Sequence, residues 1–128
     1  MDNCNRFSKF EKTVIKFQDL DKEYQKAAAL YLRNYEGPIN KNARFRLYEI
    51  PMNSIKKAIM AIPEMTMFSD FDDYHRFYSE KKAYQKKETI WPIFIDRSFG
   101  MVIEEGWGRL HNYVDDGLET VPALELYE

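Results

Sequence analysis

Cysteine is nearly absent from the sequence, since Cys4 is the only one among 128 residues. No disulfide can form within the chain, and we expect a reducing, cytoplasmic environment. Long hydrophobic runs are absent as well: Ile93-Phe94-Ile95 is typical of the longest, whereas a membrane-spanning helix needs roughly 18 apolar residues in a row. Residues 1–5 lack the apolar stretch of a secretory signal, so we expect neither export nor a membrane segment.

Glycine and proline are scarce too, with five of each, which excludes a collagen-like or low-complexity chain. Hydrophobic residues make up 45% and charged residues 31% of the sequence, a composition typical of a globular protein. A chain of this length can bury one substantial core but not two. We therefore expect one compact domain, whose 16% aromatic residues fill its core or form stacking surfaces.

Charge is distributed unevenly along the chain. Residues 104–128 contain seven acidic residues and one base, Arg109, so the preceding 103 residues carry a net charge of +4 although the whole chain carries −2. A sequence pI near 5.8 does not favour a nucleic-acid-binding protein. The basic stretch at 76–87, with five bases, is interpreted as the solvated end of a helix and the loop after it. Three acidic positions form a candidate surface for a basic protein partner: Asp115, Asp116 and Glu119.

The spacing of apolar residues predicts a small α+β domain. Residues 1–19 fit either a helix or a strand, and residues 44–128 are expected to form the core, with residues 1–43 as an N-terminal extension whose helix packs on it. Four helices are predicted. The first runs from residue 20 to 36 and is capped by Asp19, and the second runs from Asn53 or Ser54 to 62. The third runs from Ser69 into the lysine-rich stretch, and the fourth runs from 110 to Gly117. Predicted strands cover 44–50, 89–96, 101–104 and 121–127, and the middle two form a hairpin.

A glycine turn follows the predicted strand at 101–104. Gly106 and Gly108 would let the backbone turn and approach a ligand closely, and the free N–H groups at the start of the next helix would face an anion. Arg109 would add a bidentate contact to a phosphate. The same glycines also suit a purely structural turn from strand to helix, so both interpretations stay open.

The residues around this turn resemble a known superfamily. Residues 93–96, 99–109 and 117–123 are similar to the core of the ParB/sulfiredoxin superfamily, with its hairpin, acidic residue, G-x-H/R-R turn, helix and Gly-to-Val-Pro strand, and residues 46–51 are similar to its first strand. The resemblance implies a mixed sheet, an extra N-terminal helix and a pocket for CTP or ATP with Mg²⁺. The residues it assigns to nucleotide or phosphate binding are Gly106, Trp107, Gly108 and Arg109.

Two positions depart from the superfamily pattern. Gly108 stands where many members carry His or Arg, and Trp107 stands where sulfiredoxin has its reactive cysteine, so sulfiredoxin chemistry is not expected. The carboxylates of Glu104 and Glu105 are candidate ligands for Mg²⁺.

Two further features bear on function. His75 and His111 have no second histidine or cysteine at metal-ligand spacing and are interpreted as surface residues. The methionines around Pro63 suit a core, a loop lid or a partner surface.

These observations lead to three functional hypotheses. The first is a ParB-like nucleotide- or phosphate-binding accessory or regulatory protein of a phage or mobile element. The second is a protein-binding inhibitor of a host defence system, of the anti-CRISPR or anti-restriction type, that uses the acidic surface. The third is a ParB-like nuclease, which is disfavoured because Gly108 removes a natural catalytic side chain. An enzymatic role is therefore less favoured than a binding role.

Overall fold

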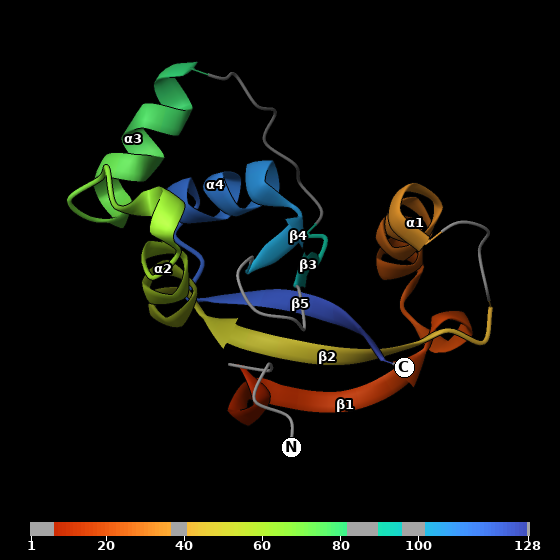
Figure 1. Cartoon of the computed structure of the whole chain (residues 1–128). Helices are drawn as coiled ribbons and strands as arrows, with labels where there is room; N and C mark the ends of the chain where they lie inside the picture. Colours follow the sequence, from red (N-terminus) through yellow and green to blue (C-terminus); the bar gives the residue numbers. More distant parts are fainter. Residues whose placement is uncertain (1–6, 37–40, 82–89, 96–101, 128) are drawn as a thin grey trace.

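The computed structural model of the chain describes residues 7–36, 41–81, 90–95 and 102–127. Within them, five strands form one mixed sheet in the order β1-β2-β5-β3-β4, which confirms the α+β fold class. The strands are β1 Glu11–Lys16, β2 Arg44–Pro51, β3 Ile93–Ile95, β4 Ile103–Glu105 and β5 Thr120–Tyr127. The α-helices are α1 Lys22–Tyr31, α2 Met52–Met60, α3 Phe71–Lys81 and α4 Trp107–Asp115 (Figure 1).

Strand β5 lies at the centre of the sheet. It pairs with β2 in antiparallel register from Arg44↔Tyr127 to Pro51↔Thr120, and with β3 in parallel register. Strands β3 and β4 pair antiparallel, which confirms the predicted hairpin, although the turn predicted between them lies outside the described residues. Strand β1 pairs antiparallel with β2, so the N-terminal stretch contributes an edge strand to the sheet.

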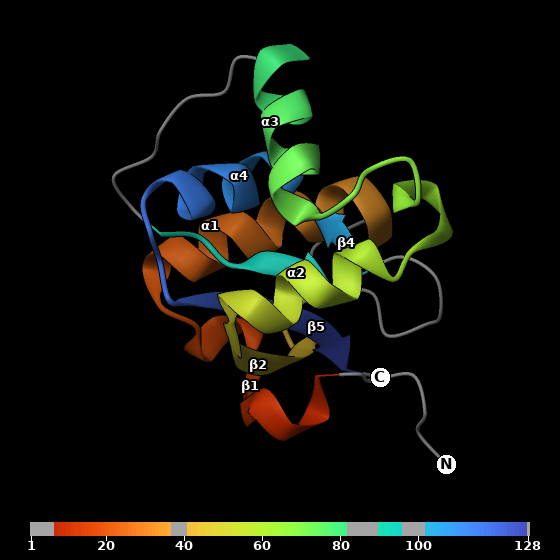
Figure 2. The same ribbon diagram turned by 90° about the vertical axis from the view of Figure 1, so that its left-hand side faces the viewer.

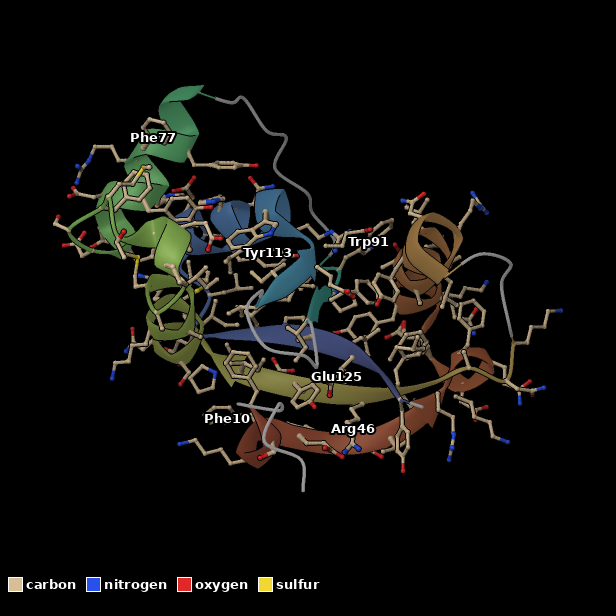
Figure 3. The ribbon with its side chains drawn as sticks, viewed as in Figure 1. Phe10, Arg46, Phe77, Trp91, Tyr113 and Glu125 are labelled. Atoms are coloured by element: carbon tan, nitrogen blue, oxygen red, sulfur yellow. The ribbon has the colours of Figure 1, made fainter. Side chains whose placement is uncertain are left out.

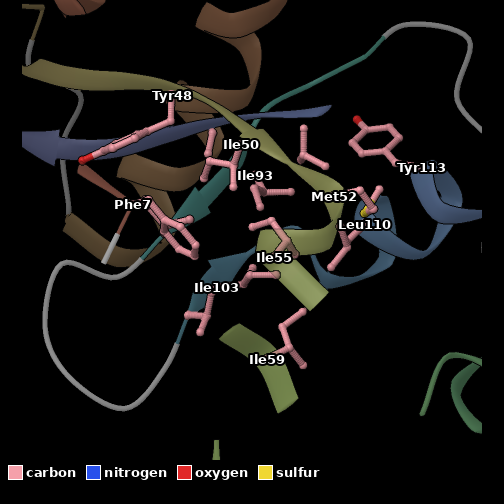
Figure 4. Packing of buried hydrophobic residues seen from close by; sticks show 14 of the residues in the cluster. Phe7, Tyr48, Ile50, Met52, Ile55, Ile59, Ile93, Ile103, Leu110 and Tyr113 are labelled. Atoms are coloured by element: carbon pink, nitrogen blue, oxygen red, sulfur yellow. The ribbon is translucent and has the colours of Figure 1, made fainter. Parts of the chain in front are cut away.

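Alternation of side chains along the strands creates a core on each face of the sheet. Phe45, Phe94 and Leu124 pack with the buried side of α1, while Ile50, Ile93 and their neighbours pack with α2, α3 and α4. Figure 2 shows α2 in front of the sheet and α1 behind it, and Figure 4 shows isoleucines of β2, β3, β4 and α2 converging in the larger core. The first helix, α1, therefore contributes its buried side to the smaller core.

Helix boundaries differ from the predictions at three N-termini. The first helix begins at Lys22 after Asp21, not after Asp19, because residues 17–19 form a 3-10 turn. The second begins at Met52 directly after Pro51, and the fourth begins three residues early because Gly106 provides the left-handed turn. Gly117 ends α4 with a φ of 73°, as predicted. None of the helices in the described residues is long and apolar enough to span a bilayer.

Candidate functional site

The predicted glycine turn is held tightly against the sheet. Gly106 has a φ of 112°, and a Cβ at this position would lie 2.8 Å from Cγ2 of Ile93 on β3. Glycine is therefore required by both backbone conformation and strand packing. Next to it, Trp107 Nε1 donates a hydrogen bond to the Ile103 carbonyl over 3.1 Å. At Gly108 the nearest atom to an added Cβ would be the Tyr78 hydroxyl, at 3.7 Å.

Arg109 bonds to the protein itself. Its Nη1 donates to the Pro92 carbonyl at 2.6 Å, and its Nη2 donates to Glu105 Oε2 at 3.3 Å. The guanidinium lies 5.4 Å from the ring of Trp91, and only 12% of the side chain is exposed. Arg109 thus ties α4 to the end of β4 and to the residue directly before β3. Phosphate binding at this turn stays a prediction.

The carboxylates of Glu104 and Glu105 do not converge. Successive residues of a strand point to opposite faces, and Glu104 accepts a hydrogen bond from the Tyr31 hydroxyl of α1 at 2.5 Å, whereas Glu105 pairs with Arg109 of α4. Within the described parts of the chain, no group of three or more His, Cys, Asp or Glu side chains is arranged to hold a metal ion. Mg²⁺ binding by this pair also stays a prediction.

The acidic positions Asp115, Asp116 and Glu119 are all exposed, as expected from their place around the end of α4. Asp115 accepts a hydrogen bond from His75 Nε2 at 2.8 Å, so it also joins α4 to α3. A hollow of about 330 Å³ lies beside Glu119, between the start of α2 and the end of α4, and Lys56 contributes to its lining.

His75 and His111 meet head to head where α3 packs on α4. Their Nδ1 atoms lie 2.6 Å apart, and the two rings are nearly coplanar, with an interplanar angle of 7°. His111 stacks on Tyr78 with ring centroids 3.9 Å apart and meets Tyr74 edge to face. The interpretation of both histidines as surface residues is wrong for His111, which is fully buried, and His75 is half-buried.

Burial decides the charge of His111. The pKa of this imidazole is lowered to about 4, mainly by burial and also by the neighbouring His75, while the carboxylate of Asp115 opposes both effects. His111 is therefore neutral at physiological pH. The sequence does contain a signal for this burial, because Trp107, Leu110, His111 and Val114 follow the spacing of one helical face.

An apolar surface lies beside α3 and is here called the α3 patch. It is formed by Phe77 of α3 together with Met67 and Phe68 of the segment before it. Met67 is 76% exposed and Phe77 is 46% exposed, and Phe77 lies on the outer part of α3, away from the sheet (Figure 3). Phe68 contacts both Phe77 and Tyr74, with ring centroids 5.4 and 5.3 Å away. The patch therefore continues the aromatic core out to the surface.

Acidic residues predominate in the stretch that carries Met67 and Phe68, and Arg76 directly precedes Phe77. Residues 58–75 contain four carboxylates and no lysine or arginine. Asp73 pairs with Arg76 at 2.8 Å, whereas Asp72 is exposed and has only the distant Lys56, at 3.8 Å, as an ion-pair partner. Met67 and Phe68 belong to the methionine-rich stretch that the sequence left open between core, lid and partner surface, and the exposure of Met67 excludes a core role for it.

The chain was compared with protein-family models, curated proteins and solved structures. No family model, curated protein or solved structure matches it.

Proposed function

We propose that the protein is a binding domain that docks a cationic amphipathic segment of a partner protein on the α3 patch. The observation that carries the proposal is the pair Met67 and Phe77, the two most exposed large hydrophobic side chains among the described residues. Methionine adapts its shape to a partner, and an aromatic ring supplies a large contact area at low entropic cost. Apolar side chains of the partner would cover both residues.

The charge around the patch specifies the partner. Residues 58–75 carry four carboxylates, of which Asp73 pairs with Arg76 and Asp72 with Lys56. Together they would attract a basic segment and repel an acidic one. Asp115 at the end of α4 lies next to α3 through its contact with His75, and Asp116 and Glu119, which follow it, are exposed as well. An inhibitor of a host defence system, which would dock on a basic protein, is one case of this role.

A peptide titration tests the proposal. The probe is a fluorescein-labelled amphipathic helix made of leucine and lysine, and its counterpart made of leucine and glutamate is the charge control. We expect fluorescence anisotropy to show binding of the lysine peptide alone, weakening as salt rises. The double variant Met67→Ser/Phe77→Ser should bind about tenfold more weakly or worse, because it removes apolar area that the complex would bury.

Leu30→Ser is the matched control, since Leu30 is an exposed apolar residue of α1, on the opposite face of the sheet. It should bind the lysine peptide like the parent protein. Asp116→Asn/Glu119→Gln tests the extended acidic surface without disturbing the Asp115 contact and should reduce the salt dependence. Equal binding of the two peptides, or equal binding by the double variant and the parent, would refute docking on the patch.

A nucleotide-binding role is the second candidate, and the chain order supports its ParB/sulfiredoxin-like origin. The hairpin, the left-handed Gly106, helix α4 and strand β5 follow one another as in that superfamily. Its test is a thermal-shift titration with CTP and ATP, with and without Mg²⁺, since a ligand that binds only the native state raises the melting temperature. Arg109→Ala is unsuitable as the binding-site variant, because it also removes the contacts with Pro92 and Glu105.

A further inference from the structure

The contact between His75 and His111 holds a single proton. Asp115 can only accept when ionised, so His75 Nε2 carries the proton of that bond. A neutral His75 then accepts at Nδ1 from His111, and a charged His75 donates from Nδ1 to a neutral His111. If both rings were cations, two N–H groups would face each other over 2.6 Å, and the hydrogen bond would be lost.

The surroundings of the pair do not favour a second positive charge. Asp115 of α4 is the carboxylate in contact with it, and Asp72, one turn before His75 on α3, pairs with Lys56 of α2. Lys56 Nζ lies 5.4 Å from the ring of Phe71, which in turn lies against both histidines. The remaining neighbours are the phenols of Tyr74 and Tyr78, and burial raises the pKa of Tyr74 to about 12.

We propose that the His75–His111 pair is a pH switch that holds α3 on α4 at neutral pH and releases it when both imidazoles are protonated. The low pKa of His111 agrees with this proposal. While α3 is packed on α4, protonation of His111 is unfavourable, whereas after release of α3 it is favourable at mildly acidic pH. If release returns His111 to an ordinary pKa near 6.5, the equilibrium for release rises about 20-fold between pH 7 and pH 5.

Release of α3 would also dismantle the α3 patch. Phe77 lies on α3, whereas Met67 and Phe68 lie in the segment before it, and the contact between Phe68 and Phe77 depends on the docked position of the helix. This consequence rests on the proposed function of the patch. The switch itself does not.

Amide hydrogen exchange of the intact protein between pH 7 and pH 5, corrected for the intrinsic exchange rate, tests the switch without a partner. We expect the protection of α3 to fall about 20-fold relative to that of α1, which lies on the opposite face of the sheet. His111→Gln, which keeps a hydrogen-bonding side chain but does not titrate, should make α3 protection nearly independent of pH, because the shifted pKa belongs to His111. Equal pH dependence in α3 and α1, or in His111→Gln and the parent protein, would overturn the proposal.

Asp115→Asn serves as a second variant, because it removes the opposing negative charge from the surface end of the pair without altering a buried ring. Release should then occur at higher pH than in the parent protein, and an unchanged or lower midpoint would contradict the switch. Binding of the leucine–lysine peptide at both pH values separates the two proposals. If the peptide fails to bind at pH 7, the proposed function of the α3 patch is refuted and the switch is not. If the peptide binds equally well at pH 5 although α3 has lost its protection, the switch does not control the patch.

Discussion

Leu32, the first residue of the π-helical turn Leu32–Glu36 that directly follows α1, tests whether α1 is part of the domain. It is buried in the smaller core, with Phe45, Phe94 and Leu124 of the sheet, whereas Leu30, two residues earlier, is 39% exposed. The same substitution at these two positions therefore separates burial from helix propensity, since alanine favours a helix at least as much as leucine does. We expect Leu32→Ala to destabilise the protein strongly and Leu30→Ala to leave its stability almost unchanged.

The expected magnitude follows from the groups removed. Leucine to alanine deletes about three carbon groups, each worth about 0.8 kcal/mol when buried, and the cavity left behind adds to the loss. The free energy of unfolding should thus fall by about 2–5 kcal/mol in Leu32→Ala and by less than about 0.5 kcal/mol in Leu30→Ala. For a chain of this length, about 3 kcal/mol corresponds to a decrease of roughly 10 °C in melting temperature.

Urea denaturation followed by circular dichroism measures both variants on the same scale. The midpoints should separate while the slopes stay equal, because the area exposed on unfolding hardly changes. Equal midpoints for Leu32→Ala and Leu30→Ala would show that α1 is not packed on the sheet in solution. The described fold of the N-terminal half would then be wrong.

Three further predictions use the same assay. Gly106→Ala should lower the free energy of unfolding by about 3 kcal/mol through backbone strain and a clash with β3. Gly117→Ala, with open space around its Cβ, should lower it by only about 1 kcal/mol. Similar losses in the two variants would contradict the tight packing of the turn at Gly106. Tyr48→Phe removes the hydroxyl that donates to buried Glu125 at 2.5 Å, so stability should fall by about 1–3 kcal/mol, and an unchanged midpoint would refute this bond. Because His111 has a lowered pKa, the unfolded state binds more protons than the folded state between pH 6.5 and 4. The free energy of unfolding should therefore fall by about 3 kcal/mol as pH decreases through this range. His111→Gln should lose this part of the pH dependence of stability.

The elements with clear periodicity were predictable from the sequence. Alternation at 44–50 identifies one strand, and the structure confirms it together with the last predicted strand at 121–127. The secondary structure of residues 7–17 was not predictable, because their aromatic and aliphatic residues fit a helical spacing as well as an extended one. Pairing with β2 selects the strand in residues 11–16, and a contact so distant along the chain leaves no local signal.

The candidate site was less predictable than the fold. The spacing of residues 71, 74, 75 and 78 places His75 on the inner face of its helix, so its partial burial was within reach of the sequence. The contact between His75 and His111 could not be predicted from the sequence, because it joins residues 36 positions apart through the packing of two helices. Glu104 and Glu105 show the same limit: their nearness in sequence suggested one metal site, while the strand directs them to two different helices.

The central position of β5 has a consequence for how the chain folds. In the described sheet, β1 and β2 form one half, β3 and β4 form the other, and only β5 hydrogen-bonds to both. During synthesis, both halves therefore precede the strand that joins them, and each exposes an unpaired edge until residues 120–127 arrive. Closure of the sheet requires contacts such as Ile50↔Val121, far apart along the chain, so the joining step should limit the rate of folding.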